Sequence, residues 1–316
     1  MQAAADLLVI VVNWNGRDLL PELVHSLRAS CPDCPVIVAD NASTDGSAAW
    51  LRREAPEVHL LELPANRGYA GGINAAIQHA SELLRAGPEP NWYLLLNNDV
   101  RLNTETVPRL RRSAERFGPG IYGPRVILAD RPDRTEATWG EITWGPALAR
   151  FYGKEQPFQG DSEPRRVPLL LGCALLVHRK VFERCGLFDE GYFLYHEELD
   201  FLYRARRAGF PVVYCPDAFV WHRGGYSSRR QAEFKTFWTR RNTVLFLRKH
   251  RPGVAAWSRF LPAAAGSIVY SLLTLRISRA RAMVAGYRAG WKAALTEPPA
   301  TAPRGKPADR ERTNRG

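Results

Sequence analysis

The sequence predicts an α/β fold in which helices flank a mixed, mostly parallel sheet. Short apolar runs rich in β-branched residues alternate with segments of helical periodicity along residues 7–96. Each predicted strand is followed by a polar loop: NWNG, DNASTDGS, NRGYAGG or NNDV. Such alternation is typical of a doubly wound sheet with right-handed crossovers, whose ligands bind beyond the carboxyl ends of the strands.

Each predicted element rests on its own pattern. Residues 7–12 are apolar throughout, as expected of a strand buried on both faces. By the same criteria, further strands are predicted at residues 35–39, 58–61 and 92–96, and helices at residues 19–29, 47–53 and 73–85. Residues 129–166 are rich in Gly, Pro, Trp and charge, which predicts an irregular insertion bordering a binding site. A buried apolar segment follows at residues 169–177.

The chain continues well beyond the predicted sheet. Its 316 residues, 45% of them hydrophobic, can bury one large α/β core and a smaller appendage. Residues 261–275 are uncharged and mostly apolar but fall short of the ~20 residues that span a bilayer, so an interfacial or core-packed helix is expected. The predicted organisation is an α/β domain at 1–245, a basic amphipathic helical extension at 246–296 and a Pro-rich, disordered tail at 297–316.

The net charge of +12 is concentrated after Arg204, where Arg and Lys are interleaved with Phe, Leu, Trp and Tyr. Amphipathic cationic helices of this kind bind anionic lipid, so an anionic membrane surface is a predicted partner. The alternative is a solvated helical face that packs on the core. The N-terminus lacks the charged start and long apolar run of a signal peptide, so export by that route is not expected.

The five cysteines form no even, regularly spaced framework, so we expect reduced thiols in a cytosolic protein. Cys31 and Cys34 make a CxxC within a Pro-flanked turn. Zinc binding or redox activity there is an alternative that lacks the support of a second cysteine pair.

Two polar loops are candidates for binding an anionic ligand. Asp40 opens DNASTDGS directly after a strand, where it can accept a hydrogen bond from a ring N–H or a sugar hydroxyl. Helix capping is the alternative for this loop. NRGYAGGIN, residues 66–74, places glycines and a positive charge before a helix, where free backbone N–H groups stabilise phosphate. An ordinary glycine-rich turn is the alternative.

Acidic residues supply the remaining candidates. Asp99 ends a strand on a polar turn and is a hard ligand for Mg²⁺ or Mn²⁺, with His222 a candidate second ligand or else a structural histidine. Glu197, Glu198 and Asp200 lie between aromatic residues in YFLYHEELDFLYR. One interpretation is a general base with apolar surroundings, and the other is a solvated helix start.

In this order, the motifs resemble glycosyltransferase family 2, and within it the bacterial rhamnosyltransferase-like members that extend cell-wall or surface polysaccharides. The resemblance covers about residues 7–242. It rests on VVNWNG, DNASTDGS, NRGYAGGIN, LLLNNDV, the GC at Gly172 and Cys173, GLFDEGYFLYHEELDF and WH. It implies a Rossmann-like GT-A nucleotide-sugar-binding fold, a dTDP-, UDP- or GDP-sugar donor and a divalent cation.

Carried over by position, the resemblance also assigns residues. Asp40 is expected to contact the nucleobase, and Asp99 and His222 to bind the metal as the acidic end of a DxD-type motif and its distal partner. The residues expected at the nucleotide are Asn13, Asn66, Arg67, Gly68, Asn97 and Asn98. Asn97 replaces the usual first Asp of the DxD motif, a change familiar among rhamnosyltransferase-like members.

The resemblance places the catalytic acid at the second position of an ED-type pair, which here is Glu197-Glu198. Glu198 is expected to be the base and Glu197 to hold the acceptor, with Asp200 the competing base. The implied reaction is a single in-line displacement that inverts the anomeric centre. In it, the base takes the acceptor proton while a cation offsets charge on the departing diphosphate.

The first expectation is therefore transfer of L-rhamnose from dTDP-rhamnose to a glycan or polyprenyl-linked glycan, by a cytoplasmic protein at the inner face of the cell membrane. One rival is a non-catalytic protein that binds nucleic acid or a membrane. Such a protein would use the positive charge without the acids, so the presence of Asp99, Glu198 and His222 together argues against it, and nucleic acid is not an expected partner. A nucleotidyltransferase that makes sugar nucleotides is a rival, but no Gly-rich Arg/Lys loop follows the first strand to bind a triphosphate. The sequence leaves the oligomeric state open.

Overall fold

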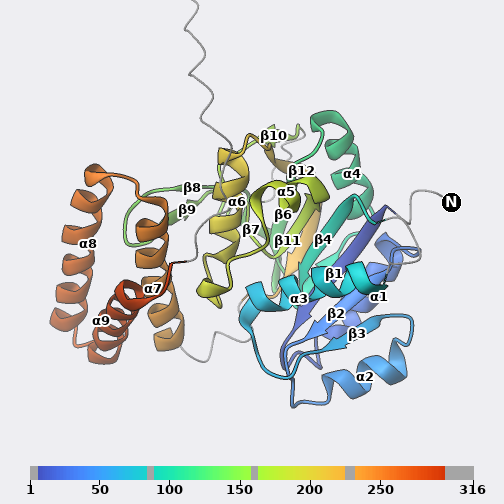
Figure 1. The fold of residues 1–316 in the computed structure, drawn as a ribbon, viewed down its shortest axis with the longest axis horizontal. Coiled ribbons are helices and arrows are strands. Elements are labelled where there is room, and N and C mark those ends of the chain that lie inside the picture. The colour runs from blue at the N-terminus through green and yellow to red at the C-terminus, as the bar shows by residue number, and fades with distance from the viewer. Residues whose placement is uncertain (1–5, 84–88, 158–162, 225–231, 296–316) are drawn as a thin grey trace, which may run out of the picture.

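The computed structural model describes residues 6–83, 89–157, 163–224 and 232–295. Within these ranges the main feature is a ten-stranded sheet of order β10-β12-β6-β11-β4-β1-β2-β3, with β5 paired to β12 and β7 to β6 (Figure 1). Its strands are β1 Leu7–Asn13, β2 Val36–Asp40, β3 His59–Glu62, β4 Trp92–Asn97, β5 Val100–Leu102, β6 Ile121–Leu128, β7 Arg131–Ala137, β10 Arg165–Arg166, β11 Ala174–His178 and β12 Val212–His222.

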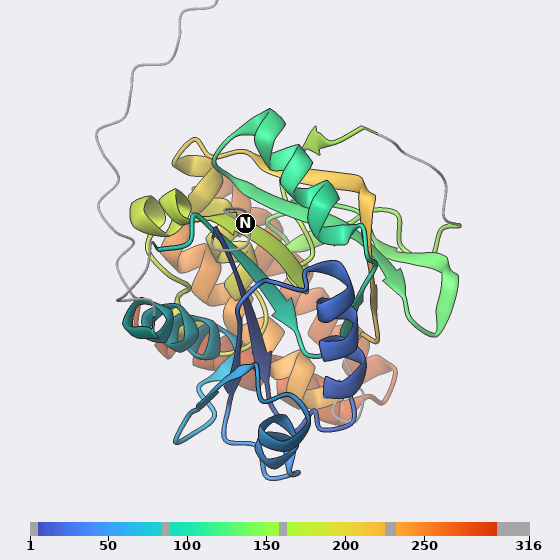
Figure 2. The ribbon, with the colours of Figure 1, turned by 90° about the vertical axis from the view of Figure 1, so that its right-hand side faces the viewer.

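Helices cover both faces of this sheet, as the turned view shows (Figure 2). Alternate residues of β1 point to opposite faces: Leu8 and Ile10 join one apolar cluster, and Leu7 and Val9 join the other. The first cluster contains apolar residues of α3 Gly68–Leu83, α5 Arg179–Cys185 and α6 Glu197–Arg207. The second includes α1 Leu20–Ser30, α2 Ser47–Glu54 and α4 Thr106–Phe117. The predicted α/β fold is confirmed. β1, β2 and β4 are mostly buried, whereas β3 lies at the edge of the sheet and is partly exposed.

The strand register gathers the polar loops at one edge of the sheet. The neighbours β3, β2, β1 and β4 are parallel, and Asn13 pairs with Asp40 while Val12 pairs with Asn97. Parallel strands end at the same edge, so loops far apart in sequence become adjacent there. β5 and β12 extend this edge, because Val100 pairs with His222.

The glycine-rich segment differs from its prediction. Residues 66–74 were expected to form a loop ahead of a helix at 73–85, but α3 already begins at Gly68. Gly72 allows this helix to pack closely on the sheet, since a Cβ there would lie 2.8 Å from a methyl of Val12. Gly68 has a φ of 72° and lies against the backbone of Phe193, where a Cβ would lie 2.0 Å from the carbonyl oxygen.

The region expected to be irregular contains short strands. Besides β7, it forms the two-stranded pair β8 Gly140–Ile142 and β9 Ala149–Phe151. Trp139 and Tyr152 pack against each other across this pair, with ring centroids 4.4 Å apart.

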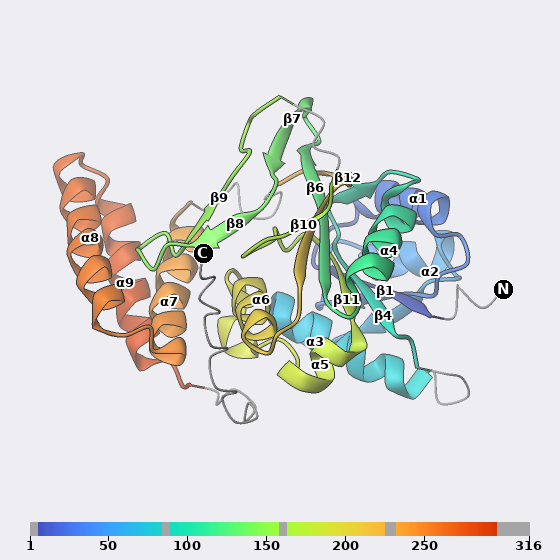
Figure 3. The same cartoon turned by 90° about the horizontal axis from the view of Figure 1, so that it is seen from above.

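The C-terminal helices pack side by side at one end of the molecule, beyond α6 (Figure 3). They are α7 Ala232–His250, α8 Val254–Leu273 and α9 Ile277–Lys292. The predicted domain boundary at 245/246 falls within α7, and the stretch 261–275 lies mainly in α8. In the described ranges, no helix is both long enough and apolar enough to cross a membrane. The predicted tail at 297–316 lies outside the described residues.

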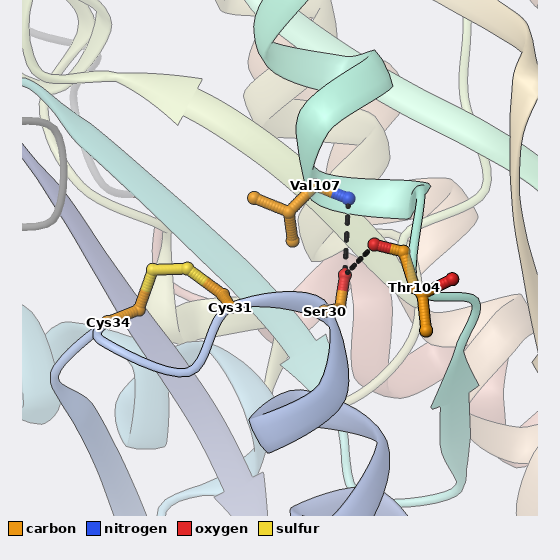
Figure 4. The surroundings of a disulfide bond; sticks show 5 residues. All are labelled: Ser30, Cys31, Cys34, Thr104 and Val107. Atoms are coloured by element: carbon orange, nitrogen blue, oxygen red, sulfur yellow. Dashed lines mark hydrogen bonds between the residues drawn. A yellow bond between two sulfur atoms is a disulfide. The ribbon is translucent and has the colours of Figure 1, made fainter.

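One expectation about the cysteines is wrong. Cys31 and Cys34 form a disulfide after the end of α1, next to Ser30, whose hydroxyl contacts Thr104 and Val107 (Figure 4). The turn holds the two Cα atoms 5.5 Å apart, within the range that a disulfide spans. The expected reduced state holds for Cys173, Cys185 and Cys215, which are free and buried.

Candidate active site

Asn13 joins the loops at the carboxyl edge of the sheet. Its Nδ2 donates to Asp40 Oδ1 at 2.8 Å and to Ser43 Oγ at 3.3 Å, while its Oδ1 accepts from Asn98 Nδ2 at 2.8 Å. Asp40 Oδ2 accepts from the backbone N–H of Ser43 at 2.9 Å. Asn13 is fully buried, so the structure shows these residues as a hydrogen-bonded scaffold. Their contacts with a nucleotide stay predictions.

The start of α3 does not offer the free N–H groups that the sequence predicted. The N–H of Arg67 donates to Asn41 Oδ1, that of Gly68 to Asn66 Oδ1, and that of Tyr69 to the carbonyl of Phe193. The Arg67 guanidinium pairs with Glu190 at 2.9 Å. In this conformation the backbone N–H groups of Arg67 and Gly68 are therefore not free to bind phosphate, because protein acceptors already occupy them. The expected contact of Asn66, Arg67 and Gly68 with a nucleotide stays a prediction.

Asp99 and His222 meet as predicted, at the end of β4 and the end of β12. His222 Nε2 lies 3.1 Å from Asp99 Oδ1, and its Nδ1 lies 2.7 Å from Glu136 Oε2 on β7. Burial acts to lower the pKa of His222, but the two carboxylates outweigh it and raise that pKa to about 10. The histidine is thus held between two acids from different strands.

This arrangement suits a cation in one respect. His222 Nε2 and Asp99 Oδ1 face each other as a buried ion pair, without hydrogen-bond geometry. Glu136 forms a hydrogen bond with the other ring nitrogen of His222, Nδ1. Carboxylates orient histidines that bind metals in the same way. Among the described residues, however, no group of three or more His, Cys, Asp or Glu side chains is placed to hold a metal by itself.

Glu197 and Glu198 lie in the first turn of α6, and Gly172 packs against Glu198. A Cβ on Gly172 would lie 2.7 Å from Glu198 Cγ, so only glycine lets the two elements approach this closely. Burial and the charge of Glu198 raise the pKa of Glu197 well above its usual value. Burial also raises the pKa of Glu198, against the opposing effect of backbone N–H groups at the helix start.

Asp200 occupies a different environment from its two acidic neighbours. Its side chain is fully buried, with Arg204 at 2.7 Å, His250 at 2.8 Å and Lys249 at 2.9 Å. Burial alone would raise the pKa of Asp200, but His250 and the charges of Arg204 and Lys249 hold it well below its usual range. A carboxylate so paired is a poor proton acceptor and links α6 to α7 instead.

Acids from β7, from the turn between β4 and β5 and from α6 lie around the Gly172-Cys173 turn. Burial raises the pKa of the Cys173 thiol well above its usual value, and the charges of Glu136, Asp99 and Glu198 add to this effect. The Asn97 N–H also donates to the Cys173 carbonyl at 3.0 Å. The structure therefore brings Asp99, Glu198 and the Glu136-bound His222 to one end of the sheet.

The matched family is glycosyl transferase family 2, whose model covers residues 8–186. This chain belongs to that family. The glycosyltransferase is 30% identical to the N-acetylglucosaminyl-diphospho-decaprenol L-rhamnosyltransferase of Mycobacterium tuberculosis over 265 residues, which cover 78% of this chain and 85% of that protein. It is 22% identical to the dTDP-rhamnosyl transferase RfbF of Shigella flexneri over 255 residues, which cover 78% of this chain and 81% of that protein. It is thus an inverting, rhamnosyltransferase-like enzyme that transfers a sugar from a nucleotide-sugar.

Solved structures share its fold. GalNAc-T7 with UDP, GalNAc and Mn²⁺ superposes with a TM-score of 0.57 at 14% identity, covering 79% of this chain and 48% of that one. The mannosyltransferase PcManGT from Pyrobaculum calidifontis, with GDP-Man and Mn²⁺, superposes with a TM-score of 0.54 at 17% identity. This match covers 91% of this chain and 86% of that one. The predicted GT-A fold of the glycosyltransferase is confirmed.

Sequence reasoning did not find some residues that the structure adds to this glycosyltransferase site. Glu136 lies in the region expected to be irregular, and nothing in the local pattern distinguishes it from nearby charged residues. The sequence singles out Gly172 only as part of the GC pair. A glycine within an apolar segment is a signal that another part of the chain approaches its backbone closely, and this signal points to Gly172.

Proposed function

We propose that the glycosyltransferase moves L-rhamnose from dTDP-rhamnose onto a hydroxyl of N-acetylglucosaminyl-diphospho-polyprenol. The names of the mycobacterial and Shigella relatives support this donor and this acceptor class. The observation that carries the catalytic part is the convergence of Asp99, Glu198 and His222 at one edge of the sheet.

In this proposal Glu198 is the base. Its carboxylate takes the proton of the acceptor hydroxyl as that oxygen forms a bond to the anomeric carbon, and the bond from that carbon to the diphosphate oxygen breaks. Glu197, whose pKa burial and the charge of Glu198 raise well above its usual value, holds the acceptor hydroxyl through Oε2, which has no partner among the described residues.

Asp99 and His222 are the proposed ligands of a divalent cation, Mg²⁺ or Mn²⁺. Their facing atoms, a buried pair 3.1 Å apart without hydrogen-bond geometry, are the observation that fits a cation there. When bound, the ion would offset negative charge on the departing diphosphate. Since the protein supplies few ligands, phosphate oxygens and water would complete the coordination.

The donor and acceptor are tested by offering the full chain a panel of dTDP-, UDP- and GDP-sugars with Mn²⁺ and a synthetic N-acetylglucosaminyl-diphospho-polyprenol. We expect transfer from dTDP-rhamnose at least about tenfold faster than from any other donor, and a product with inverted anomeric configuration. Faster transfer from a UDP- or GDP-sugar would refute the proposed donor. Product formation only on an acceptor without a lipid would refute the proposed acceptor.

We also propose that α8 and the α8–α9 turn rest on an anionic membrane that holds this acceptor. Residues 234–296 contain no Asp or Glu. The cations of α8, α9 and their turn form no ion pair with a described residue: Arg259, Arg276, Arg279, Arg281, Arg288 and Lys292. The same region exposes large apolar side chains: Leu261, Val269, Tyr270, Leu272, Leu273, Leu275 and Ile277. Exposed apolar groups beside unpaired cations suit an anionic lipid interface.

The position of this turn supports the same proposal. In Figure 1 the α8–α9 turn lies at the lower end of the molecule, where the parallel strands β1 and β2 also finish. A membrane that contacts the turn would therefore face the edge of the sheet that carries the candidate active site.

Vesicle flotation tests this placement. Two kinds of vesicle are compared: one contains about 30% phosphatidylglycerol, which is anionic, and the other contains phosphatidylcholine alone. We expect the full chain to float with the anionic vesicles about tenfold better than with the neutral ones. The double variant Leu273→Asp/Leu275→Asp should lose most of this binding, whereas Val254→Asp, an equally exposed site at the other end of α8, should keep it. Equal binding by both variants would refute the proposed orientation.

A further inference from the structure

The segment that leads into α6 has an unfavourable backbone conformation. Phe193, Tyr195 and His196 have φ angles of 61°, 69° and 72°, in the left-handed region that residues with side chains rarely adopt. His196 is the residue immediately before α6, and Glu197 and Glu198 follow it. Such a segment keeps its shape only if the surrounding structure holds it.

A single side chain on α7 holds most of this segment. Asn242 is fully buried, and the two hydrogens of its Nδ2 are shared among the carbonyl oxygens of Tyr192, Leu194 and Tyr195, at 2.9, 2.9 and 2.7 Å from the nitrogen. Arg241 fixes the amide from the other side, because its Nη1 donates to Asn242 Oδ1 at 2.7 Å. The amide is thus oriented with its donors toward the segment.

Neighbouring contacts supplement this connection but do not duplicate it. Arg241 also donates to the Gly191 carbonyl at 2.7 Å, and His196 Nε2 lies 3.3 Å from Thr243 Oγ1. The Phe193 ring stacks on Trp238 with centroids 4.8 Å apart. These contacts reach the two ends and one side chain of the segment, and the Tyr69 N–H donates to the Phe193 carbonyl at 2.9 Å. Asn242 is bonded to the other three backbone carbonyls of residues 192–195.

We propose that Asn242 is a positioning residue, which sets the location of Glu198 by fixing the backbone of residues 192–195 ahead of α6. This inference rests on the proposed role of Glu198 as base. Displacement of a catalytic group by about 1 Å is enough to cost about 10²-fold in rate. Asn242 does not touch the reacting atoms in this scheme, and it acts through the first turn of α6.

Steady-state kinetics of Asn242→Ala and of the isosteric Asn242→Asp test the proposal at a temperature where both are folded. Both variants lose the amide donors, so kcat is expected to fall about 10²-fold while the donor KM changes less than about threefold. Thr106→Val is the matched control, since it removes a buried hydroxyl that donates to the Phe219 carbonyl at 2.7 Å on another helix. Its kcat should stay within about twofold of the wild-type value.

Two further measurements separate positioning from simple loss of stability. Amide hydrogen exchange at residues 193–198 should be faster in Asn242→Ala and unchanged in Thr106→Val. In a double-mutant cycle, Asn242→Ala should lower the residual activity of Glu198→Gln by less than about threefold, because both act through one group. Losses that multiply in the cycle, or a kcat for Asn242→Ala that matches the control, would overturn the proposal. Full activity of Glu198→Gln would instead refute the base assignment.

Discussion

The two halves of the carboxyl edge are built differently. On the side of β1 and β2, the side chains of Asn13, Asp40 and Asn98 satisfy one another through hydrogen bonds. On the side of β4, β12 and α6, Asp99 Oδ1 and His222 Nε2 meet only as an ion pair at 3.1 Å, and Glu197 Oε2 has no hydrogen-bond partner among the described residues. The first half is a hydrogen-bonded scaffold, whereas the second is held by charge and leaves one buried oxygen without a partner.

This difference indicates where chemistry takes place. A buried polar atom without a partner costs about 1–3 kcal/mol, so it is retained where a ligand completes it. In the proposed scheme a cation completes Asp99 and His222, and the acceptor completes Glu197. The satisfied half, by contrast, holds Asn13, Asp40 and Asn98, the residues predicted to contact the donor, in one fixed arrangement.

The largest expected effect is at the second half. Glu198→Gln removes the proposed proton acceptor but keeps the shape of the side chain, so kcat should fall by about 10³-fold while donor binding stays within about threefold. Asp200→Asn should behave in the opposite way. It breaks a buried ion cluster, so stability should fall by about 3–5 kcal/mol with a small change in the kcat of folded protein.

Steady-state kinetics and urea unfolding of these two variants, measured side by side, check the assignment. If Glu198→Gln retained turnover and Asp200→Asn lost it without unfolding, the roles of the two acids would be reversed. The pH dependence gives a second check. Because burial raises the pKa of Glu198, the acid limb of kcat/KM should lie above the ordinary glutamate value of 4.5 and should disappear in Glu198→Gln.

An intermediate effect is expected for metal binding. The metal-free His222 has a pKa of about 10, so it is protonated at neutral pH and must lose that proton to bind an ion. The apparent affinity for Mn²⁺ should therefore rise with pH from 6.5 to 8.5, by up to about tenfold per pH unit.

Calorimetry in buffers of different ionisation enthalpy measures this proton release directly. Glu136→Gln should lower the pKa of His222 and so reduce both the proton release and the steepness of the pH dependence. An Mn²⁺ affinity independent of pH in the unaltered chain would contradict the placement of the ion at His222.

The smallest effect is expected in the scaffold. Asn13→Ala leaves Asp40 Oδ1 and Asn98 Nδ2 without their shared partner, which should lower the free energy of unfolding by about 1–3 kcal/mol. Denaturant unfolding measures this, and kcat of the folded variant should fall less than about tenfold. An unchanged stability together with a large rise in donor KM would show instead that Asn13 binds the nucleotide directly.

The sequence by itself determined the fold class and the location of the site. Periodicity is a local property, so strands such as residues 7–12 and the polar loops after them were readable one at a time. The topology of parallel sheets then requires those loops to share one edge, and Asp99 and His222 were predicted to meet there.

Only the tertiary structure decided which polar groups are free to act. Glu197, Glu198 and Asp200 look alike in sequence, yet Lys249 and His250, about fifty residues later, neutralise only Asp200. The N–H groups before α3 looked available until Asn41 and Phe193 were seen to accept from them. Whether a polar group is satisfied depends on partners from distant parts of the chain, and no local pattern specifies them.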